Sequence, residues 1–361
     1  MGIFLYIIVA ILVLSLLVFF HELGHYSVAK LFGVKIERFS IGFGKPFYKK
    51  YWLDTEWVFA PILLGGYVKM KGQDDINPLE KNCDKDSYNS KKPWQRILIL
   101  LAGPFANILL AFFIYLIIAL NGAPISAASD YLEPIVGSVK ANSPAQKAGL
   151  KRGDKIVKVG NIDIKYWYEL GNAIQNSNPP IRLLIKRDGK DINLSLNYMI
   201  ENRQNEFNET IKRKIIGITP LVKKNQIINF SITDAIKYAY NETIKATLLI
   251  TKGLQKVTTG EVDSKNISGA ITIFDILIKF AQAGFIYLLY IMALISVNLG
   301  VLNLLPIPAL DGGHIMFNLY EMITKKPPSE EILYKLTVAG WIILLSLMMF
   351  GLYNDINRIW G

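Results

Sequence analysis

The sequence has a single cysteine, Cys83, and only three histidines among its 361 residues. One cysteine cannot form an intramolecular disulfide bond, and Cys83 lies far in sequence from every histidine. A cysteine-based structural zinc site and a redox pair are therefore excluded, and we interpret Cys83 as an incidental thiol in a cytoplasmic loop.

Charge is missing from four long runs, residues 1–20, 97–120, 281–310 and 336–353, which contain no Asp, Glu, Lys or Arg. About 18 to 20 apolar residues are enough for a helix to cross the bilayer core. The mean hydropathy of +0.30, with 52% hydrophobic residues, also exceeds that of an ordinary soluble protein. We therefore predict an integral membrane protein with four transmembrane helices.

The first run also allows a secretory signal peptide as the alternative. It lacks a positively charged n-region and a small-residue cleavage site, and it leads directly into a polar cluster. These features favour a membrane span that is retained.

The net charge of +11 does not by itself indicate nucleic acid binding. Lys and Arg gather after the first run, before the second and between the third and fourth. With four spans, all three groups fall on one side, and basic loops are typical of the cytoplasmic side. We therefore predict the lipid bilayer and no nucleic acid as a partner, with both termini facing away from the cytoplasm.

Outside the spans, the sequence indicates two regions with strands. Residues 34–72 combine apolar stretches with Gly and Pro turn signals and predict short strands, followed by a solvated loop over residues 73–92. Residues 123–220 predict a small mixed α/β module, in which Asp188-Gly189 indicates a hairpin and residues 202–214 a loop. From Ser231 an amphipathic surface helix is expected, with Ser231 and Asp234 as its cap.

The expected segments alternate between membrane helices and extramembrane regions. The first membrane helix (1–33) is followed by a membrane-associated β region with its loop on the cytoplasmic side (34–92). The others are the second membrane helix (93–122), the α/β module (123–222), the amphipathic helix with a linker (223–275), the third membrane helix (276–324) and the fourth with the C-terminus (325–361).

The stretch "FFHELGHY" carries the clearest chemical signal. His21 and His25 are four residues apart, so on a helix they share one face and can hold one ion. Glu22 lies beside that face, where it can reach a water molecule on the metal. This is the His-Glu-x-x-His pattern of zinc hydrolases, and it predicts one catalytic Zn²⁺.

A catalytic zinc ion usually takes a third protein ligand and keeps one open position. Asp311 and Glu321 are charged residues near the membrane edges, and Asp311 ends a thirty-residue uncharged run, where an unpaired carboxylate would be costly. His314 is the alternative ligand. Lys30 follows His21 by nine residues, about 13 Å along a helix; if Lys30 marks the cytoplasmic interface, the site lies within the membrane and points to an embedded substrate.

Several motifs together resemble the site-2 protease family of intramembrane zinc metalloproteases, more narrowly the bacterial regulator of sigma-E protease group. They are "HELGH", "ERFSIGFGKPF", "PILLGGYVKM", "AGPFAN" and "SVNLGVLNLLPIPALDGGH". The resemblance implies His21, His25 and Asp311 as zinc ligands and Glu22 as the catalytic acid and base. It also implies a bacterial inner-membrane location.

The resemblance further assigns substrate handling to Asn298 and Asn303; the alternative for these amides is hydrogen bonding between membrane helices. Gly42-Phe43-Gly44 and Gly65-Gly66-Tyr67 resemble membrane-associated β elements, whose strand edge could pair with an unwound substrate. Pro306 and Pro308 should break the third span next to a polar cavity.

"PIVGSV" and "SPAQKAGLKRGDKIVKV" resemble a single PDZ domain. Two roles remain open for it: recognition of a peptide tail, or a steric screen that binds no peptide. In addition, Ala270 stands where relatives often have proline, which leaves substrate gating open.

The predicted function is cleavage of single-span membrane proteins in or near their transmembrane segment. The resemblance implies anti-sigma factors and remnant signal peptides as substrates. The alternative is a membrane-anchored PDZ scaffold or sensor with a vestigial metal site. A small-solute transporter is disfavoured, because there is no inverted-repeat signal.

Overall fold

The computed structural model describes residues 2–73, 84–205, 207, 209–223, 227–261 and 268–360. Cys83 lies outside these residues. The chain divides into two compact units, one formed by residues 1–118 and 236–361 and the other by residues 119–235. Helices α2 and α6 run across the boundaries between them.

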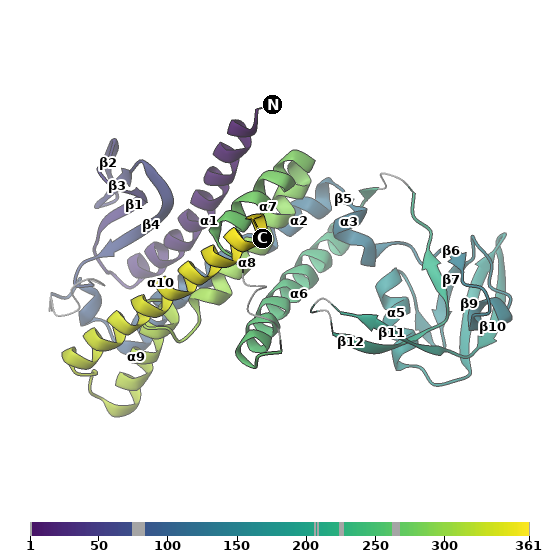
Figure 1. Ribbon diagram of the computed structural model, residues 1–361. Coiled ribbons are helices and arrows are strands. Elements are labelled where there is room, and N and C mark those ends of the chain that lie inside the picture. Colours follow the sequence, from purple (N-terminus) through teal and green to yellow (C-terminus); the bar gives the residue numbers. More distant parts are fainter. Residues whose placement is uncertain are drawn as a thin grey trace. The chain divides into compact units, whose positions relative to one another are not determined.

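Among the described residues, seven helices are at least 14 residues long (Figure 1). They are α1 (Ile3–Leu31), α2 (Pro93–Asn121), α6 (Ile232–Thr258), α7 (Ala270–Ala283), α8 (Phe285–Asn303), α9 (Asp311–Thr324) and α10 (Glu330–Trp360). Within α1, α2, α8 and α10 lie segments long and apolar enough to cross a membrane. These four coincide with the four uncharged runs of the sequence.

The expected third membrane helix, residues 276–324, differs from the observed structure, in which three helices share this segment. Gly284 separates α7 from α8 with a φ of +131°, a conformation that side-chain-bearing residues rarely adopt. The second break lies between Asn303 and Asp311 and contains Pro306 and Pro308, where the prolines predicted it. Only α8 in this segment is long enough to span the membrane.

The first unit also contains a four-stranded mixed sheet with the order β2-β3-β1-β4. Its strands are β1 (Ile36–Phe43), β2 (Tyr48–Trp52), β3 (Thr55–Phe59) and β4 (Ile62–Met70). β1 pairs parallel with β3 and antiparallel with β4, so β4 is an edge strand. Tyr26 of α1 packs with Phe39 and Met70 of the sheet in one buried cluster, which fixes the sheet on the C-terminal half of α1.

Tyr88 belongs to the same buried cluster, although residues 73–92 were expected to form a solvated loop. It lies in a short 3₁₀ helix, η1 (Tyr88–Ser90). The polar neighbours of Tyr88 concealed this contact in the sequence.

The second unit is built on an antiparallel sheet with the order β10-β9-β7-β8 (Figure 1). These strands are β7 (Lys155–Val159), β8 (Ile162–Asp163), β9 (Ile181–Arg187) and β10 (Lys190–Leu196). Ile156, Leu183 and Ile185 of the sheet are fully buried and pack with Leu170 of helix α5 (Trp167–Asn176). The mixed α/β module predicted for this part of the chain is therefore present.

The described residues of the second unit also form three two-stranded pairs and three short helices. The paired strands are β5 (Ala123–Pro124) with β14 (Ile227–Ile228), β6 (Val136–Val139) with β13 (Ile218–Pro220), and β11 (Met199–Gln204) with β12 (Thr210–Ile215). The short helices are α3 (Ile125–Ala128), α4 (Pro144–Lys147) and the 3₁₀ helix η2 (Ser129–Tyr131).

Asp188 and Gly189 form the predicted hairpin turn between β9 and β10. Their φ angles are +49° and +79°, which suits the type I′ turns that match the twist of a two-residue hairpin. The flanking pair Arg187 and Lys190 is in register, so this prediction is confirmed.

The loop predicted for residues 202–214 is wrong, because β11 and β12 form an antiparallel hairpin there. Most side chains of this ribbon are exposed. The two strands together contain only four apolar residues, Met199, Ile200, Ile211 and Ile215, so their polar composition resembles that of a loop.

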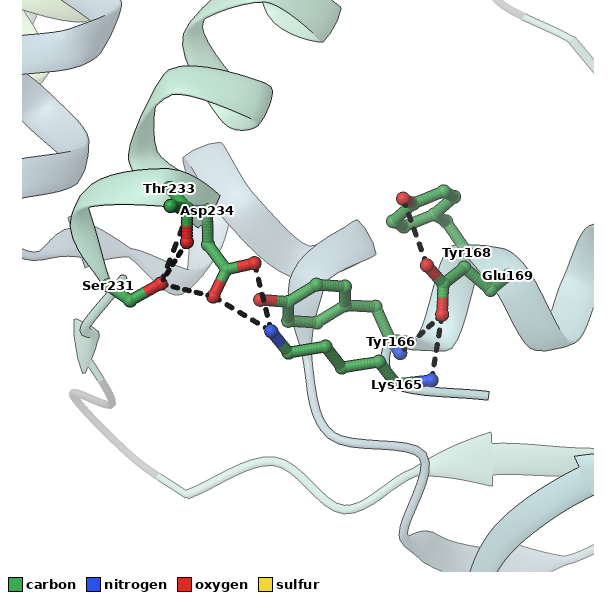
Figure 2. A network of polar contacts seen from close by, with 7 residues as sticks. All are labelled: Lys165, Tyr166, Tyr168, Glu169, Ser231, Thr233 and Asp234. Atoms are coloured by element: carbon green, nitrogen blue, oxygen red, sulfur yellow. Dashed lines mark hydrogen bonds and ion pairs between the residues drawn. The ribbon is translucent and has the colours of Figure 1, made fainter. Parts of the chain in front are cut away.

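Helix α6 begins with the predicted cap. Asp234 donates its backbone N–H to Oγ of Ser231 over 3.2 Å, and Lys165 reaches both carboxylate oxygens of Asp234 at 2.8–2.9 Å (Figure 2). At the start of α5, Glu169 accepts hydrogen bonds from the backbone N–H groups of Lys165 and Tyr166. Lys165 thus contacts the cap of α6 through its side chain and the cap of α5 through its backbone N–H.

Asp154 is the most buried charged residue among the described residues of the second unit, with 1% of its surface exposed. Arg187 donates to both of its carboxylate oxygens at 2.7 Å, and the N–H of Lys151 adds a bond of 2.8 Å. Burial by itself raises the pKa of Asp154, but these hydrogen bonds outweigh it and hold the pKa below its usual value. The pair ties the turn before β7 to the end of β9.

Replacing Arg187 with Met should lower the stability of the second unit by about 2–3 kcal/mol, because the Asp154 carboxylate then stays buried without its partner. Hydrogen exchange of β7 and β9 amides in the full-length protein, corrected for intrinsic rates, measures this loss. Because the pKa of Asp154 is lower in the folded state than in the unfolded state, the ionised carboxylate contributes its full stabilisation above about pH 4. This stabilisation is lost as the pH falls further, so the stability difference between wild type and Arg187→Met should become smaller at lower pH.

The exposed pair Lys158–Asp163 provides the control. Asp163→Asn should change stability by no more than about 0.5 kcal/mol. Equal exchange in wild type and Arg187→Met at neutral pH would contradict the role assigned to the buried pair.

Candidate metal centre

His21 and His25 lie on one face of α1, as their spacing predicts. Their Nε2 atoms are 3.2 Å apart, and both side chains are at least nine-tenths buried. Nδ1 of His25 lies 2.8 Å from the backbone carbonyl oxygen of Ile99. A carbonyl oxygen only accepts hydrogen bonds, so Nδ1 of His25 carries the proton and its Nε2 offers a lone pair.

Asp311 reaches the two histidines from the first turn of α9. Its Oδ2 lies 3.3 Å from Nε2 of His21 and 3.3 Å from Nε2 of His25. Two glycines bring this turn into place: a Cβ on Gly312 would lie 2.3 Å from the carbonyl oxygen of Leu305, and one on Gly313 would lie 2.3 Å from that of Ile307. The "DGG" sequence therefore lets α9 start directly against the chain that precedes it.

These three atoms suit a metal ion. His21, His25 and Asp311 form a candidate metal-binding group, with edges of 3.2–3.3 Å between the facing atoms. A tetrahedral site with zinc–nitrogen distances of about 2.0–2.1 Å separates its ligand atoms by about 3.3–3.4 Å. A metal cation among these atoms would be attracted to the Asp311 carboxylate and to the imidazole nitrogens, and it would compensate the buried carboxylate. The residues present therefore fit zinc.

Helix α2 supplies the surroundings of both imidazoles. A Cβ on Gly103 would lie 2.3 Å from Nε2 of His25 and 2.9 Å from Cε1 of His21, so only glycine leaves room for the two rings. Nδ2 of Asn107, a fully buried residue, lies 3.1 Å from Nδ1 of His21. These contacts are possible because α1 and α2 approach each other closely at Gly24, where an added Cβ would meet the carbonyl oxygen of Ala102.

The motif "AGPFAN" carries part of the family resemblance, but its sequence alone predicted no role for Gly103 or Asn107. One signal was available: a buried amide in an otherwise apolar membrane helix requires a polar partner. The identity of the partner of Asn107 depends on how α1 and α2 pack together, and no rule of residue spacing in the sequence predicts that packing.

Glu22 faces the sheet. A Cβ on Gly66 would lie 3.6 Å from Cγ of Glu22 and 2.6 Å from the carbonyl oxygen of Ser40. The bare backbone of β4 therefore passes directly beside the Glu22 side chain. The edge strand and the carboxylate share one side of α1.

The two glycine motifs expected to bind substrate meet each other in the sheet. Gly42 lies in a bulge of β1 with a φ of +89°, and a Cβ there would meet the carbonyl oxygen of Ala60 at 2.5 Å. Gly44 follows with a φ of +100°. The ring of Phe43 covers Gly65 and stacks on Tyr67 at 6.2 Å.

Among the described residues, the candidate metal-binding group includes neither His314 nor Glu321. Asn298 and Asn303 are half-buried on α8, and among the described residues neither side chain has a hydrogen-bond partner. His314 packs edge-on against Phe317, and Glu321 pairs with Arg96 at 2.7 Å. The structure thus places Asp311, and not His314 or Glu321, beside the two histidines.

Known proteins match almost the whole chain. Residues 9–347 match the sequence profile of peptidase family M50. A protein of Campylobacter jejuni named "Putative zinc metalloprotease Cj1068" is 45% identical over 97% of this chain and 93% of its own length. A protein of Helicobacter pylori (strain J99) named "Putative zinc metalloprotease" is 36% identical over 98% of this chain and 99% of its own length. "Metalloprotease MmpA" of Caulobacter vibrioides is 33% identical over 98% of this chain and 96% of its own length.

Replacing Gly103 with Ala should weaken zinc binding at least about tenfold, because the added methyl group displaces both imidazoles. Competition with a chromophoric chelator measures the affinity. Gly171→Ala in α5 is the control, since a Cβ there meets nothing within 4 Å, and the affinity should not change. Zinc affinity equal to wild type in Gly103→Ala would refute the packing argument.

Proposed function

Because this chain belongs to peptidase family M50, the site-2 protease family, we propose that it cleaves membrane-embedded proteins with one zinc ion held by His21, His25 and Asp311. The observation that carries this proposal is the triangle of three buried ligand atoms with edges of 3.2–3.3 Å. Membership of the family makes the protein a metalloprotease, and its apolar helices make it a membrane protein.

Glu22 is the proposed acid and base of the reaction. Zinc at this site would supply Lewis acidity toward a water molecule and the scissile carbonyl group. The Glu22 carboxylate takes a proton from the attacking water and returns it to the amine that leaves. Glu22 follows His21 directly in α1 and lies beside the ligand face, which supports this role.

The substrate must present an extended backbone, because a helix hides its peptide bonds in its own hydrogen bonds. We assign this task to the edge of β4, where a substrate strand could add to the sheet by β-augmentation. Gly65, Gly66 and Tyr67 would line it, with Gly42-Phe43-Gly44 at its end. Gly66 supports this assignment because it brings the strand beside Glu22.

Asn298 and Asn303 are proposed to contact the substrate backbone. Both amides lie on α8 without a partner in the described part of the chain, and an uncharged amide can bind a peptide group in lipid without adding an unpaired charge. Packing between membrane helices is the competing role for both.

The second unit is proposed to be a PDZ domain on the periplasmic side of a bacterial inner membrane. Its four-stranded sheet and helix α5 are compatible with such a module. It would either bind a peptide tail or exclude proteins with bulky outer domains. Either role favours single-span substrates that another protease has already trimmed, such as anti-sigma factors and remnant signal peptides.

Glu22→Gln should lower the cleavage rate of a single-span substrate in proteoliposomes by about 10²–10⁴-fold, with zinc content unchanged. Glu37→Gln is the control. Glu37 is an exposed residue of β1 that pairs with Lys69 of β4, and the variant should cleave the substrate at the wild-type rate. Retained cleavage in Glu22→Gln would refute its role. Wild-type protein without stoichiometric zinc would favour a membrane-anchored scaffold over an enzyme.

The predicted orientation can be tested with the chain's only cysteine. Four spans with basic loops on the cytoplasmic side place residue 83 in the cytoplasm. A membrane-impermeant maleimide should therefore label Cys83 in inverted inner-membrane vesicles and leave it unlabelled in spheroplasts. Cysteines introduced by Asp163→Cys and Ser195→Cys in a Cys83→Ser background should show the opposite pattern, and labelling of Cys83 from the outside would overturn the topology.

A further inference from the structure

One stripe of α2 touches both histidines. Ile99, Gly103 and Asn107 are spaced by four residues and therefore follow one face of the helix. The carbonyl oxygen of Ile99 contacts His25, Gly103 makes room for both rings, and Asn107 contacts His21. The two imidazoles thus have outer partners of different kinds.

The partner of His25 permits one tautomer. A backbone carbonyl oxygen accepts only, so Nδ1 of His25 stays protonated and Nε2 stays available as a ligand. The partner of His21 is an amide, which can donate through its nitrogen or accept through its oxygen. Asn107 can therefore hydrogen-bond either tautomer of His21, depending on which amide atom faces the ring.

As the side chains lie, the amide nitrogen faces Nδ1 of His21 at 3.1 Å, which requires a lone pair on Nδ1 and a proton on Nε2. Ligation of zinc through Nε2 requires the opposite tautomer, with the proton on Nδ1. The amide oxygen must then face the ring, which a half-turn of the Asn107 amide achieves, because nitrogen and oxygen are nearly the same size.

The surroundings of Asn107 leave the imidazole as its partner. Its Oδ1 is buried and has no hydrogen-bond partner among the described residues. Helix α8 closes over it: Ser296 donates to its backbone carbonyl oxygen at 2.7 Å, and a Cβ on Gly300 would lie 3.5 Å from its Cβ. The side chain is fully buried, so water does not compete for the amide.

We propose that Asn107 is a positioning residue for the metal site, and that its amide turns to accept the Nδ1 proton of His21 when Nε2 binds zinc. The inference rests on the proposed function, because it presupposes zinc at His21. Outer partners that fix ligand tautomers change metal affinity by about 10–100-fold.

Asn107→Leu, which has similar volume and no acceptor, should weaken zinc binding about 10–100-fold in the chelator competition assay. Asn107→Asp keeps an oxygen toward Nδ1 of His21 and should bind zinc as tightly as wild type or more tightly. A carboxylate only accepts hydrogen bonds, so it favours the Nδ1–H tautomer of His21 both with and without zinc. A role in packing alone predicts that both variants are equally weak, and that result would overturn the proposal, as would wild-type affinity in Asn107→Leu.

Asn318→Leu is the matched control. Asn318 is a buried amide that donates to the carbonyl oxygen of His314 in its own helix, and its loss should leave zinc affinity unchanged. If wild-type protein binds no zinc, the proposed function fails; if wild type binds zinc and Asn107→Leu binds it equally well, only this inference fails.

A second measurement does not depend on the folding of the leucine variant. The chain has three histidines, so selective ¹⁵N labelling yields six ring nitrogen signals. Zinc-loaded wild type and Asn107→Asp should both show His21 bound through Nε2 with a protonated Nδ1, identified by loss of the signals in His21→Gln. Ligation of His21 through Nδ1 would overturn the proposal.

Discussion

The convergence of three electron-rich atoms in a buried site governs the rest of the helical unit. Nε2 of His21, Nε2 of His25 and Oδ2 of Asp311 are held within 3.2–3.3 Å of one another, although they repel unless a cation or proton lies between them. Such a group persists only where the surrounding helices hold it from several sides. α1 contributes two of the atoms, α9 the third, and α2 the contacts behind the imidazoles.

The break between α8 and α9 is what allows a carboxylate to enter from the end of a helix. Pro306 and Pro308 prevent a continuous helix, and hydrogen bonds such as Ile307 N–H to the carbonyl oxygen of Leu305 satisfy part of the freed backbone. Helix α10 contacts this connection, since a Cβ on Gly340 would lie 2.8 Å from the backbone nitrogen of Ala309. The connection is only partly covered: Leu304 and Pro306 are exposed, and residues 307–310 are half-buried.

Much of this architecture was accessible from the sequence, because each correct expectation used a local rule. Uncharged runs marked the spans, residue spacing placed His21 and His25 on one face, and Asp188-Gly189 marked a hairpin. The selection of Asp311 used the cost of an isolated carboxylate in lipid and a family resemblance. The structure then brings this residue to the histidines.

The misses share a different cause. Gly284 lies inside the uncharged run of residues 281–310, so the limits of that run could not locate the break. The β11–β12 ribbon contains only four apolar residues, too few to reveal its period. Gly103 and Asn107 act across helices, and their contacts depend on how α1 and α2 pack.

The glycines at helix contacts have a consequence for how this sequence can change. At positions 24, 103 and 300 an added Cβ would come within 3 Å of atoms on a neighbouring helix, so even a single methyl group forces the backbones apart. The lipid-facing surfaces of the same helices impose no comparable restriction. Tolerance to substitution should therefore vary strongly along each helix. Residues on the outer surface can be replaced readily, whereas a few glycine positions that carry no reactive group cannot.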